Sequence, residues 1–142
     1  MGLAKVVGAV GLGVGLAASI GVADAPAAQA GLSGYQGAWV LSGRDCASVY
    51  SSAGKGTSFK KPIDIFAPAF VVAGNRLRTP MALCRIASVR PASDRQILVL
   101  NCANSVAANE VKVIMATMPN GILKRYYSEQ DSTGVDYQRC SQ

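Results

Sequence analysis

The residues with the most definite chemistry in this chain of 142 residues are its four cysteines, Cys46, Cys84, Cys102 and Cys140. They lie 38, 18 and 38 residues apart, no two of them form a C-x-x-C pair, and the chain contains no histidine. Since zinc sites in proteins are built from closely spaced cysteines and histidines, this pattern argues against metal binding. We expect two disulfides instead, the usual arrangement for an even number of cysteines in an exported domain.

Groups suited to acid–base catalysis are sparse. Without histidine, neither a Ser-His-Asp nor a Cys-His arrangement can form. The segment Gly54-Lys55-Gly56-Thr57-Ser58 has the glycines and lysine of a phosphate-binding loop, but Val49 stands where such a loop has its first glycine and Gly56 where it has Ser or Thr. Seven carboxylates follow residue 30 and are scattered over predicted turns and strand ends: Asp45, Asp64, Asp94, Glu110, Glu129, Asp131 and Asp136. We therefore predict a protein that is not an enzyme and needs no cofactor or metal.

The first thirty residues have the pattern of a secretory signal peptide. Lys5 precedes an apolar, glycine-rich run at 6–23, and Ala28-Gln29-Ala30 provides a small-residue cleavage site. The alternative is a retained membrane anchor, which the many glycines, Asp24 and Pro26 disfavour. We predict cleavage before Gly31, a mature protein without a membrane span, and a periplasmic or secreted location in a bacterium.

The mature segment, 31–142, has the length of one domain and keeps a formal net charge of +6. A basic balance favours an acidic protein surface or an anionic component of the cell envelope as partner. Nucleic acid is disfavoured, since the domain is exported and its basic residues are scattered. We expect a monomer.

Short runs with period-two alternation, separated by turn residues, predict an all-β domain. Gly74-Asn75 and Met118-Pro119-Asn120-Gly121 are typical of tight hairpin turns. Such a series predicts a small antiparallel meander of about seven to eight strands, closed as a barrel or, alternatively, folded as a sandwich. The segments with strand character are 38–41, 63–66, 70–73, 76–78, 82–89, 96–103, 111–117, 122–127 and 135–139, and 51–61 is the one long irregular loop.

The central hairpin suggests a disulfide pairing. With its turn centred on Ser93, Cys84 lies opposite Cys102 on the mostly apolar face, Ile86 faces Leu100, Ser88 faces Leu98, Arg85 faces Asn101, and Ala87 faces Val99. A bridge between two opposed cysteines leaves Cys46 to pair with Cys140, closing a loop of about 95 residues. The two other pairings, Cys46 with Cys84 or Cys46 with Cys102, stay open at this stage.

Gly37-Ala38-Trp39 at the start of the first strand resembles the G-x-W entry of lipocalin-like (calycin) barrels, and Gly37 to Leu41 followed by Cys46 is similar to the start of bacterial metalloprotease-inhibitor barrels. The resemblance covers about ten residues. It implies an arginine near the last strand that covers Trp39, with Arg139 at the matching position and Arg125 as a second candidate. From its chemistry alone, a single tryptophan near glycines is expected to fill one end of the core, with its indole N–H bonded to the backbone.

Two functions are compatible with these features. The first is an exported binding module, such as an inhibitor or partner-binding protein of the cell envelope, that uses Lys55, Phe59, Lys60 and Lys61 as an aromatic anchor flanked by positive charge. The second is a carrier of a small apolar ligand inside the barrel. The residues expected to line that interior are Phe66, Phe70, Leu98, Leu100, Val113 and Met115. An interior cavity of several hundred cubic ångströms favours the carrier, and a packed interior favours the binding module.

Overall fold

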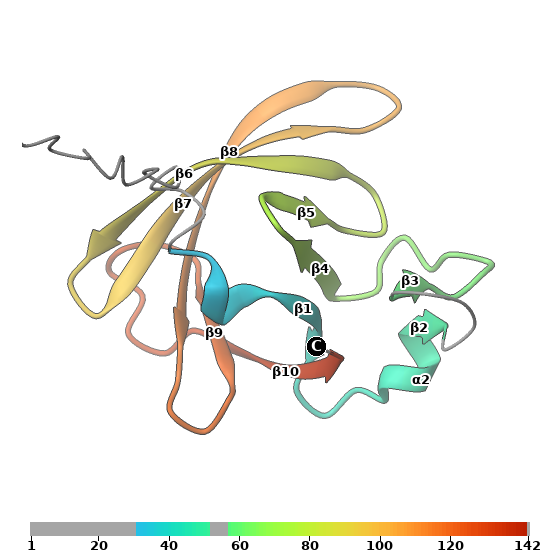
Figure 1. Cartoon of the computed structure of the whole chain (residues 1–142), viewed down its shortest axis with the longest axis horizontal. Helices are drawn as coiled ribbons and strands as arrows, with labels where there is room; N and C mark the ends of the chain where they lie inside the picture. Colours follow the sequence, from blue (N-terminus) through green and yellow to red (C-terminus); the bar gives the residue numbers. More distant parts are fainter. Residues whose placement is uncertain (1–30, 52–56, 142) are drawn as a thin grey trace, which may run out of the picture.

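The computed structural model describes residues 31–51 and 57–141 (Figure 1). The predicted signal peptide, 1–30, and Lys55 lie outside the described residues. No helix in the described ranges is long and apolar enough to cross a membrane.

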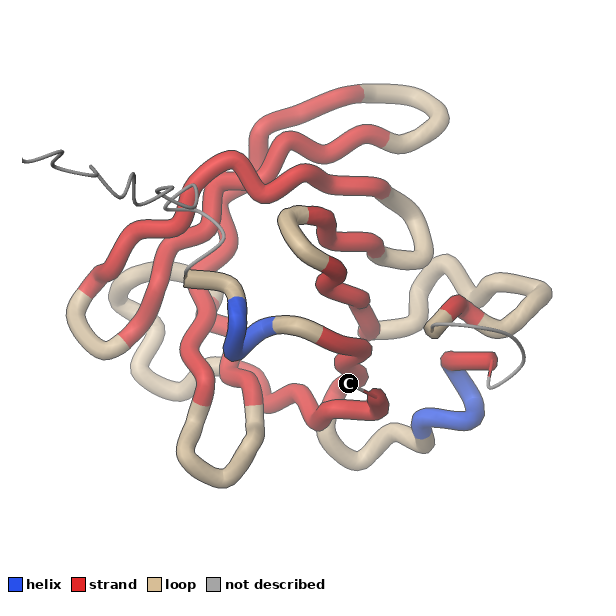
Figure 2. Tube along the Cα trace, in the orientation of Figure 1, coloured by secondary structure: helices blue, strands red, loops and turns tan. Residues whose placement is uncertain are grey.

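Eight antiparallel strands form a closed barrel, as predicted, rather than a sandwich (Figures 1 and 2). Each strand pairs with the next one along the barrel, and the last strand returns to pair with the first, Trp39 lying opposite Arg139. Closure pairs every strand with a neighbour on both sides over at least part of its length. The strands are β1 (Gly37–Leu41), β4 (Ala69–Ala73), β5 (Arg76–Arg78), β6 (Leu83–Ala92), β7 (Arg95–Ala103), β8 (Ala108–Thr117), β9 (Leu123–Tyr126) and β10 (Val135–Ser141).

In an antiparallel barrel, successive connections lie at opposite ends, so every second connection lies at the same end. The two ends of this barrel therefore carry different sets of connections. One end, which we call the closed end, carries the 3-10 helix η1 (Ser33–Tyr35) and the tight turns at 74–75, 93–94 and 118–122. Gly74 and Gly121 adopt φ values of 60° and 80° there, so both predicted glycine turns are present. The other end, which we call the open end, carries the connections at 60–68, 79–82 and 104–107 (Figure 2).

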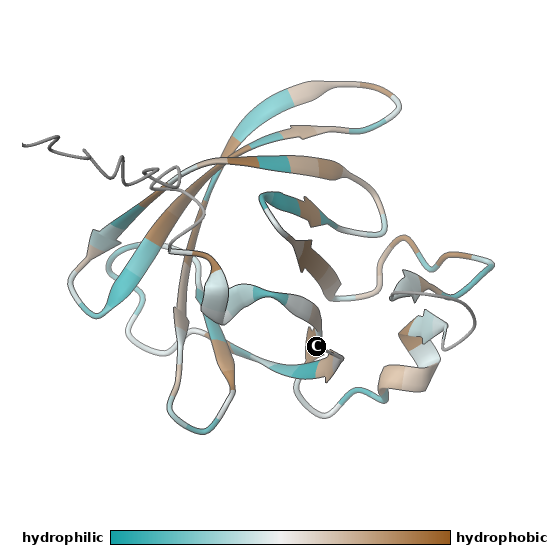
Figure 3. Cartoon of the chain, in the orientation of Figure 1, coloured by the Kyte–Doolittle hydropathy of each residue, from teal (hydrophilic) through white to brown (hydrophobic). Residues whose placement is uncertain are grey.

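The main core lies inside the barrel and is built from alternate residues of every strand. Figure 3 shows hydrophobic and hydrophilic residues interspersed along these strands. Its most deeply buried members gather toward the closed end: Leu32, Tyr35, Trp39, Val72, Ile86, Leu98, Met115 and Leu123. This alternation is the reason for the period-two pattern in the sequence.

β1 and β4 are buried on both faces. Their outward residues Ala38, Val40 and Val71 form a second core with a layer made of α2 (Cys46–Val49), β2 (Tyr50–Ser51) and β3 (Ser58–Phe59). Tyr50 fixes this layer to the barrel, since its hydroxyl donates to the carbonyl oxygens of Trp39 and Phe70, at 2.6 and 3.0 Å. The sequence predicts one irregular loop at 51–61, but both of its described ends belong to this small β2–β3 sheet.

A predicted strand at 63–66 is absent. The Asp64 side chain accepts a hydrogen bond from the Phe66 amide, and the Asp64 carbonyl accepts one from the Ala67 amide. Asp64 therefore closes a turn that competes with strand pairing. As a result Phe66 is 82% exposed, and its predicted place in the barrel interior is wrong.

The β6–β7 hairpin has the predicted register near its cysteines and a different one near its turn. Cys84 pairs with Cys102 and Ile86 with Leu100, but a bulge at Ala87 shifts the rest. Ser88 therefore pairs with Val99 instead of Leu98, and the predicted pairing of Ala87 with Val99 is also wrong. The bulge adds one residue to β6, which moves the turn to Ser93 and Asp94 together.

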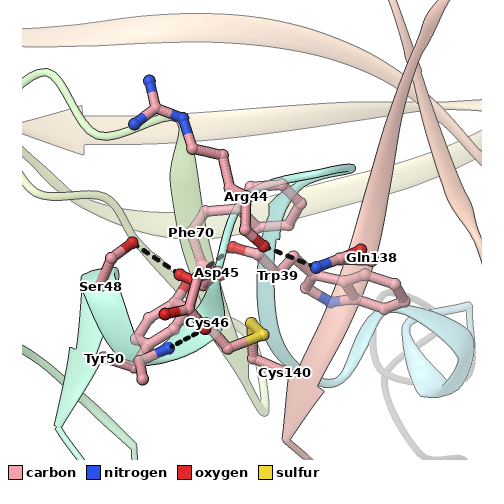
Figure 4. The surroundings of a disulfide bond; sticks show 10 residues. Trp39, Arg44, Asp45, Cys46, Ser48, Tyr50, Phe70, Gln138 and Cys140 are labelled. Carbon is pink, nitrogen blue, oxygen red and sulfur yellow. Dashed lines mark hydrogen bonds between the residues drawn. A yellow bond between two sulfur atoms is a disulfide. The ribbon is translucent and has the colours of Figure 1, made fainter.

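Both predicted disulfides are present, Cys84 with Cys102 and Cys46 with Cys140, and no cysteine is free. The Cα atoms of the first pair are 4.0 Å apart, as expected for closely opposed residues on neighbouring strands. The second bridge joins the start of α2 to β10, and so ties the outer layer to the last strand (Figure 4). Two disulfides indicate an oxidising, extracellular type of compartment.

Candidate functional site: an apolar cavity at the open end

The barrel interior is not completely filled. A cavity of about 430 Å³, which we call the barrel cavity, lies between the packed closed end and the loops of the open end, and it opens to solvent. Its wall is mostly apolar and includes Phe70, Leu77, Leu100, Val111, Val113 and Met115. The volume falls within the range of about 300–1,000 Å³ typical of small-molecule sites.

The cavity exists because neighbouring strands differ in length. β8 begins at Ala108, but β9 pairs with it only from Ile114 to Thr117. The first half of β8 therefore has a neighbour only on the β7 side, and the inward face of Val111 is left partly open. The cavity opens along this flank toward the loops of the open end.

Apolar side chains are exposed in the loops around the opening. Ile65 and Met81 line the cavity and are about half exposed, while Val106 at the β7–β8 tip is 90% exposed. Exposed apolar side chains that border a cavity add to the apolar surface that a ligand can contact.

The predicted interior residues divide into two groups. Phe70, Leu100, Val113 and Met115 line the barrel cavity as predicted. Leu98 is fully buried in the core without reaching the cavity, and Phe66 lies outside the barrel.

Trp39 and Arg139 close the other end. Trp39 is 1% exposed, and its indole N–H donates to the Tyr35 carbonyl at 2.8 Å. The Arg139 guanidinium lies over the indole ring, 4.4 Å from its centroid, and donates to the carbonyls of Gly34 and Gln36. The contact that the calycin resemblance implies for Trp39 is therefore made by Arg139, and Arg125 lies elsewhere.

Tyr35 completes the closed end. Its hydroxyl donates to the Gln96 side chain at 2.5 Å, and burial raises the pKa of this phenol to about 12. The polar groups of Tyr35, Trp39 and Arg139 at this end are therefore satisfied within the protein.

Charged groups are almost absent from the barrel cavity. Arg125 is the one charged residue among the described residues that line it, and the other polar lining residues are Thr79, Asn104, Asn109 and Tyr137. Within the described ranges no three His, Cys, Asp or Glu side chains are grouped to hold a metal ion. The cavity offers apolar contact area and one cation.

Of the residues predicted to bind a partner, Phe59 belongs to the outer layer, and Lys60 and Lys61 follow it. The Phe59 ring stacks on Tyr50, with centroids 5.4 Å apart, so Phe59 has a packing partner within the protein. Lys60 and Lys61 are exposed and line a small groove with Ile63. Lys55 lies outside the described residues.

Comparison of the chain with known protein families, with curated proteins and with solved structures finds no match. The site is therefore assessed from its geometry.

Proposed function

We propose that this protein is a non-enzymatic carrier that holds a small apolar molecule in the barrel cavity. One observation carries the proposal, the mostly apolar cavity of about 430 Å³ that opens to solvent inside an otherwise packed barrel. A closed barrel braced by two disulfides supplies a rigid wall, which lowers the entropic cost of ligand binding.

The structure supports this function better than catalysis. Hydrolytic or transfer chemistry needs a nucleophile or a general base beside the substrate. Asn, Thr, Tyr and Arg are the polar residue types in the described lining, and the two cysteines there are joined to each other. Binding by apolar contact needs none of those groups.

We further propose that the carrier acts outside the cytoplasm, in the bacterial periplasm or as a secreted protein. Two disulfides and the signal-like segment at 1–30 support this location.

The test is a titration of the mature protein with N-phenyl-1-naphthylamine, a neutral dye that fluoresces in apolar surroundings. Val111→Trp places a bulky ring on the cavity wall, and Lys112→Trp adds the same ring to the next residue, which faces outward. We expect dye binding to the wild type and to Lys112→Trp, and at least a tenfold loss with Val111→Trp. Absence of binding to the wild type, or equal binding by both variants, would refute the proposal.

A second candidate function is binding of another protein by the segment at 57–66. The observation that favours it is the 82% exposure of Phe66, which follows Lys60 and Lys61 in the same connection. Phe66→Ala would then abolish capture of a protein from a periplasmic extract while leaving dye binding unchanged. Unchanged capture by Phe66→Ala would argue against this second candidate.

A further inference from the structure

We infer that the barrel cavity binds a single-chain amphiphile with an anionic head group, a long-chain carboxylate, and that Arg125 and Tyr137 bind the head group. This inference rests on the proposed function and names the class of ligand that the cavity takes. The observation behind it is the placement of one unpaired cation and one free hydroxyl on a wall that is otherwise mostly apolar.

Arg125 lines the barrel cavity from the inner face of β9 and is itself exposed rather than buried. It pairs with Met115 on β8 and with Val135 on β10, both of which pack in the inner core. Residues paired across neighbouring strands share a face of the sheet, so Arg125 lies on the inner face as well. Lys124, the residue before it, lies on the outer face and forms an ion pair with Asp136 at 2.6 Å.

The Arg125 guanidinium has no hydrogen bond or ion pair with any described residue. By contrast, Arg139 and Arg95, which pack against aromatic rings, both have polar partners. Arg139 donates to two carbonyls at the closed end, and Arg95 donates to the Asp131 carbonyl at 2.8 Å and lies 3.4 Å from the Asp94 carboxylate. Arg125 thus keeps all of its donors for a ligand, and no Asp or Glu among the described residues lines the cavity to compete for them.

Tyr137 supplies a second polar group on the same wall. Its ring is buried and packs against Phe70, with centroids 5.2 Å apart. Its hydroxyl makes no hydrogen bond with a described residue. In the described ranges, every fully buried side-chain oxygen or nitrogen has a hydrogen-bond partner, so an oxygen without one is not fully buried. The hydroxyl is therefore accessible, and the open space that Tyr137 lines is the barrel cavity.

The two groups are close enough to act on one head group. Tyr137 pairs with Leu123, and Arg125 with Val135, which makes Arg125 and Tyr137 diagonal neighbours on the inner face. Such neighbours have Cα atoms about 7–8 Å apart, within the reach of long side chains. A guanidinium binds a carboxylate through two parallel N–H groups, and a phenol can donate a third hydrogen bond. The alkyl chain of the ligand then lies against Phe70, Leu100 and Val113.

The experiment compares decanoate, decanol and decyltrimethylammonium as competitors of N-phenyl-1-naphthylamine at pH 7.5. These compounds share an alkyl chain and differ in head-group charge. Arg125→Gln removes the cation from the cavity, Tyr137→Phe removes the hydroxyl, and Arg90→Gln is the matched control, since Arg90 is exposed and pairs with Ile97 on the outer face of the barrel.

We expect the wild type to bind decanoate about 10- to 100-fold more tightly than decanol, as for a charge-assisted hydrogen-bonded pair, and to bind the ammonium compound most weakly. Arg125→Gln should remove that preference and leave decanol affinity unchanged. Tyr137→Phe should reduce the preference, and Arg90→Gln should keep it.

Equal binding of decanoate and decanol by the wild type would overturn the inference while leaving the carrier proposal standing. The same conclusion follows if Arg125→Gln weakens both ligands alike or if Arg90→Gln removes the preference. Failure of decanol and dye to bind at all would instead refute the proposed function, and this inference with it.

Discussion

Replacement of Trp39 by alanine is the sharpest test of how the closed end is held. Trp39 is 1% exposed, and a buried tryptophan removes roughly 200 Å² from water, worth about 5 kcal/mol at 25 cal/mol per Å². Measured Trp-to-Ala changes in cores cost about 3–5 kcal/mol. We therefore expect Trp39→Ala to lower the free energy of unfolding by about 4 kcal/mol. For a domain of this size, that loss corresponds to a fall in Tm of roughly 12–25 °C.

The assay is urea and thermal unfolding of the mature protein with its disulfides intact. Trp39→Phe is the control, since it keeps an aromatic ring on Phe70 and loses the indole donor to Tyr35. Combining Trp39→Ala with Arg139→Ala in a double-mutant cycle should give a coupling of about 0.5–2 kcal/mol for the ring and guanidinium. A Trp39→Ala protein that melts within about 3 °C of the wild type would refute the assignment of Trp39 as the plug of the barrel.

Three further outcomes follow from the contacts described above. Replacing Cys46 and Cys140 together by alanine should cost about 4–5 kcal/mol in the free energy of unfolding, since the bridge closes a loop with a sequence separation of 94, and unfolding in urea measures it. The pKa of Tyr35 is about 12 in the folded protein against an ordinary 10.0, so the stability that its neutral form contributes is complete below pH 10 and is lost as the pH rises toward 12. Tyr35→Phe should therefore reduce the fall of Tm at alkaline pH. An unchanged fall of Tm would contradict this assignment. Phe59→Ala should lower the free energy of unfolding by about 1–3 kcal/mol because the ring stacks on Tyr50. A melting curve equal to that of the wild type would mean that Phe59 does not stabilise the fold.

The sequence alone was sufficient to predict the disulfide within the β6–β7 hairpin. The pairing of Cys84 with Cys102 depends on a hairpin whose two strands are adjacent in the chain, and period-two alternation is sufficient to place both cysteines on one face. The other disulfide then follows by elimination. The bulge at Ala87 shifts the inward positions of β6 from Cys84 and Ile86 to Val89, and a register extended from a turn centred on Ser93 allows for no extra residue.

The outer layer could have been anticipated in part. The uninterrupted apolar runs Ala38-Trp39-Val40-Leu41 and Ala69-Phe70-Val71-Val72 are typical of strands buried on both faces, and both strands are covered by α2, β2 and β3. These runs therefore indicated that the segment between the two strands covers them, but they gave no sign of its short helix.

The cavity itself depends on where strands end relative to their neighbours, which is a non-local property. Nothing in the sequence near Val111 shows that β9 stops at Tyr126 and leaves that flank open. Arg125 carried one signal that could have been used. In the alternation Leu123, Lys124, Arg125, Tyr126, a charged residue occupies an inward position, which indicates that this part of the interior is not dry.

The central claim, that the barrel cavity holds an apolar ligand, is tested most directly by the methyl NMR signals of the mature protein during titration with decanol. We expect saturable shifts of the Leu100, Val113 and Met115 methyl signals, because these residues line the cavity. The methyl signals of Val40 and Ile97, buried in the two cores outside the barrel, should stay unchanged. Unchanged cavity signals, or equal shifts in all five residues, would contradict the account.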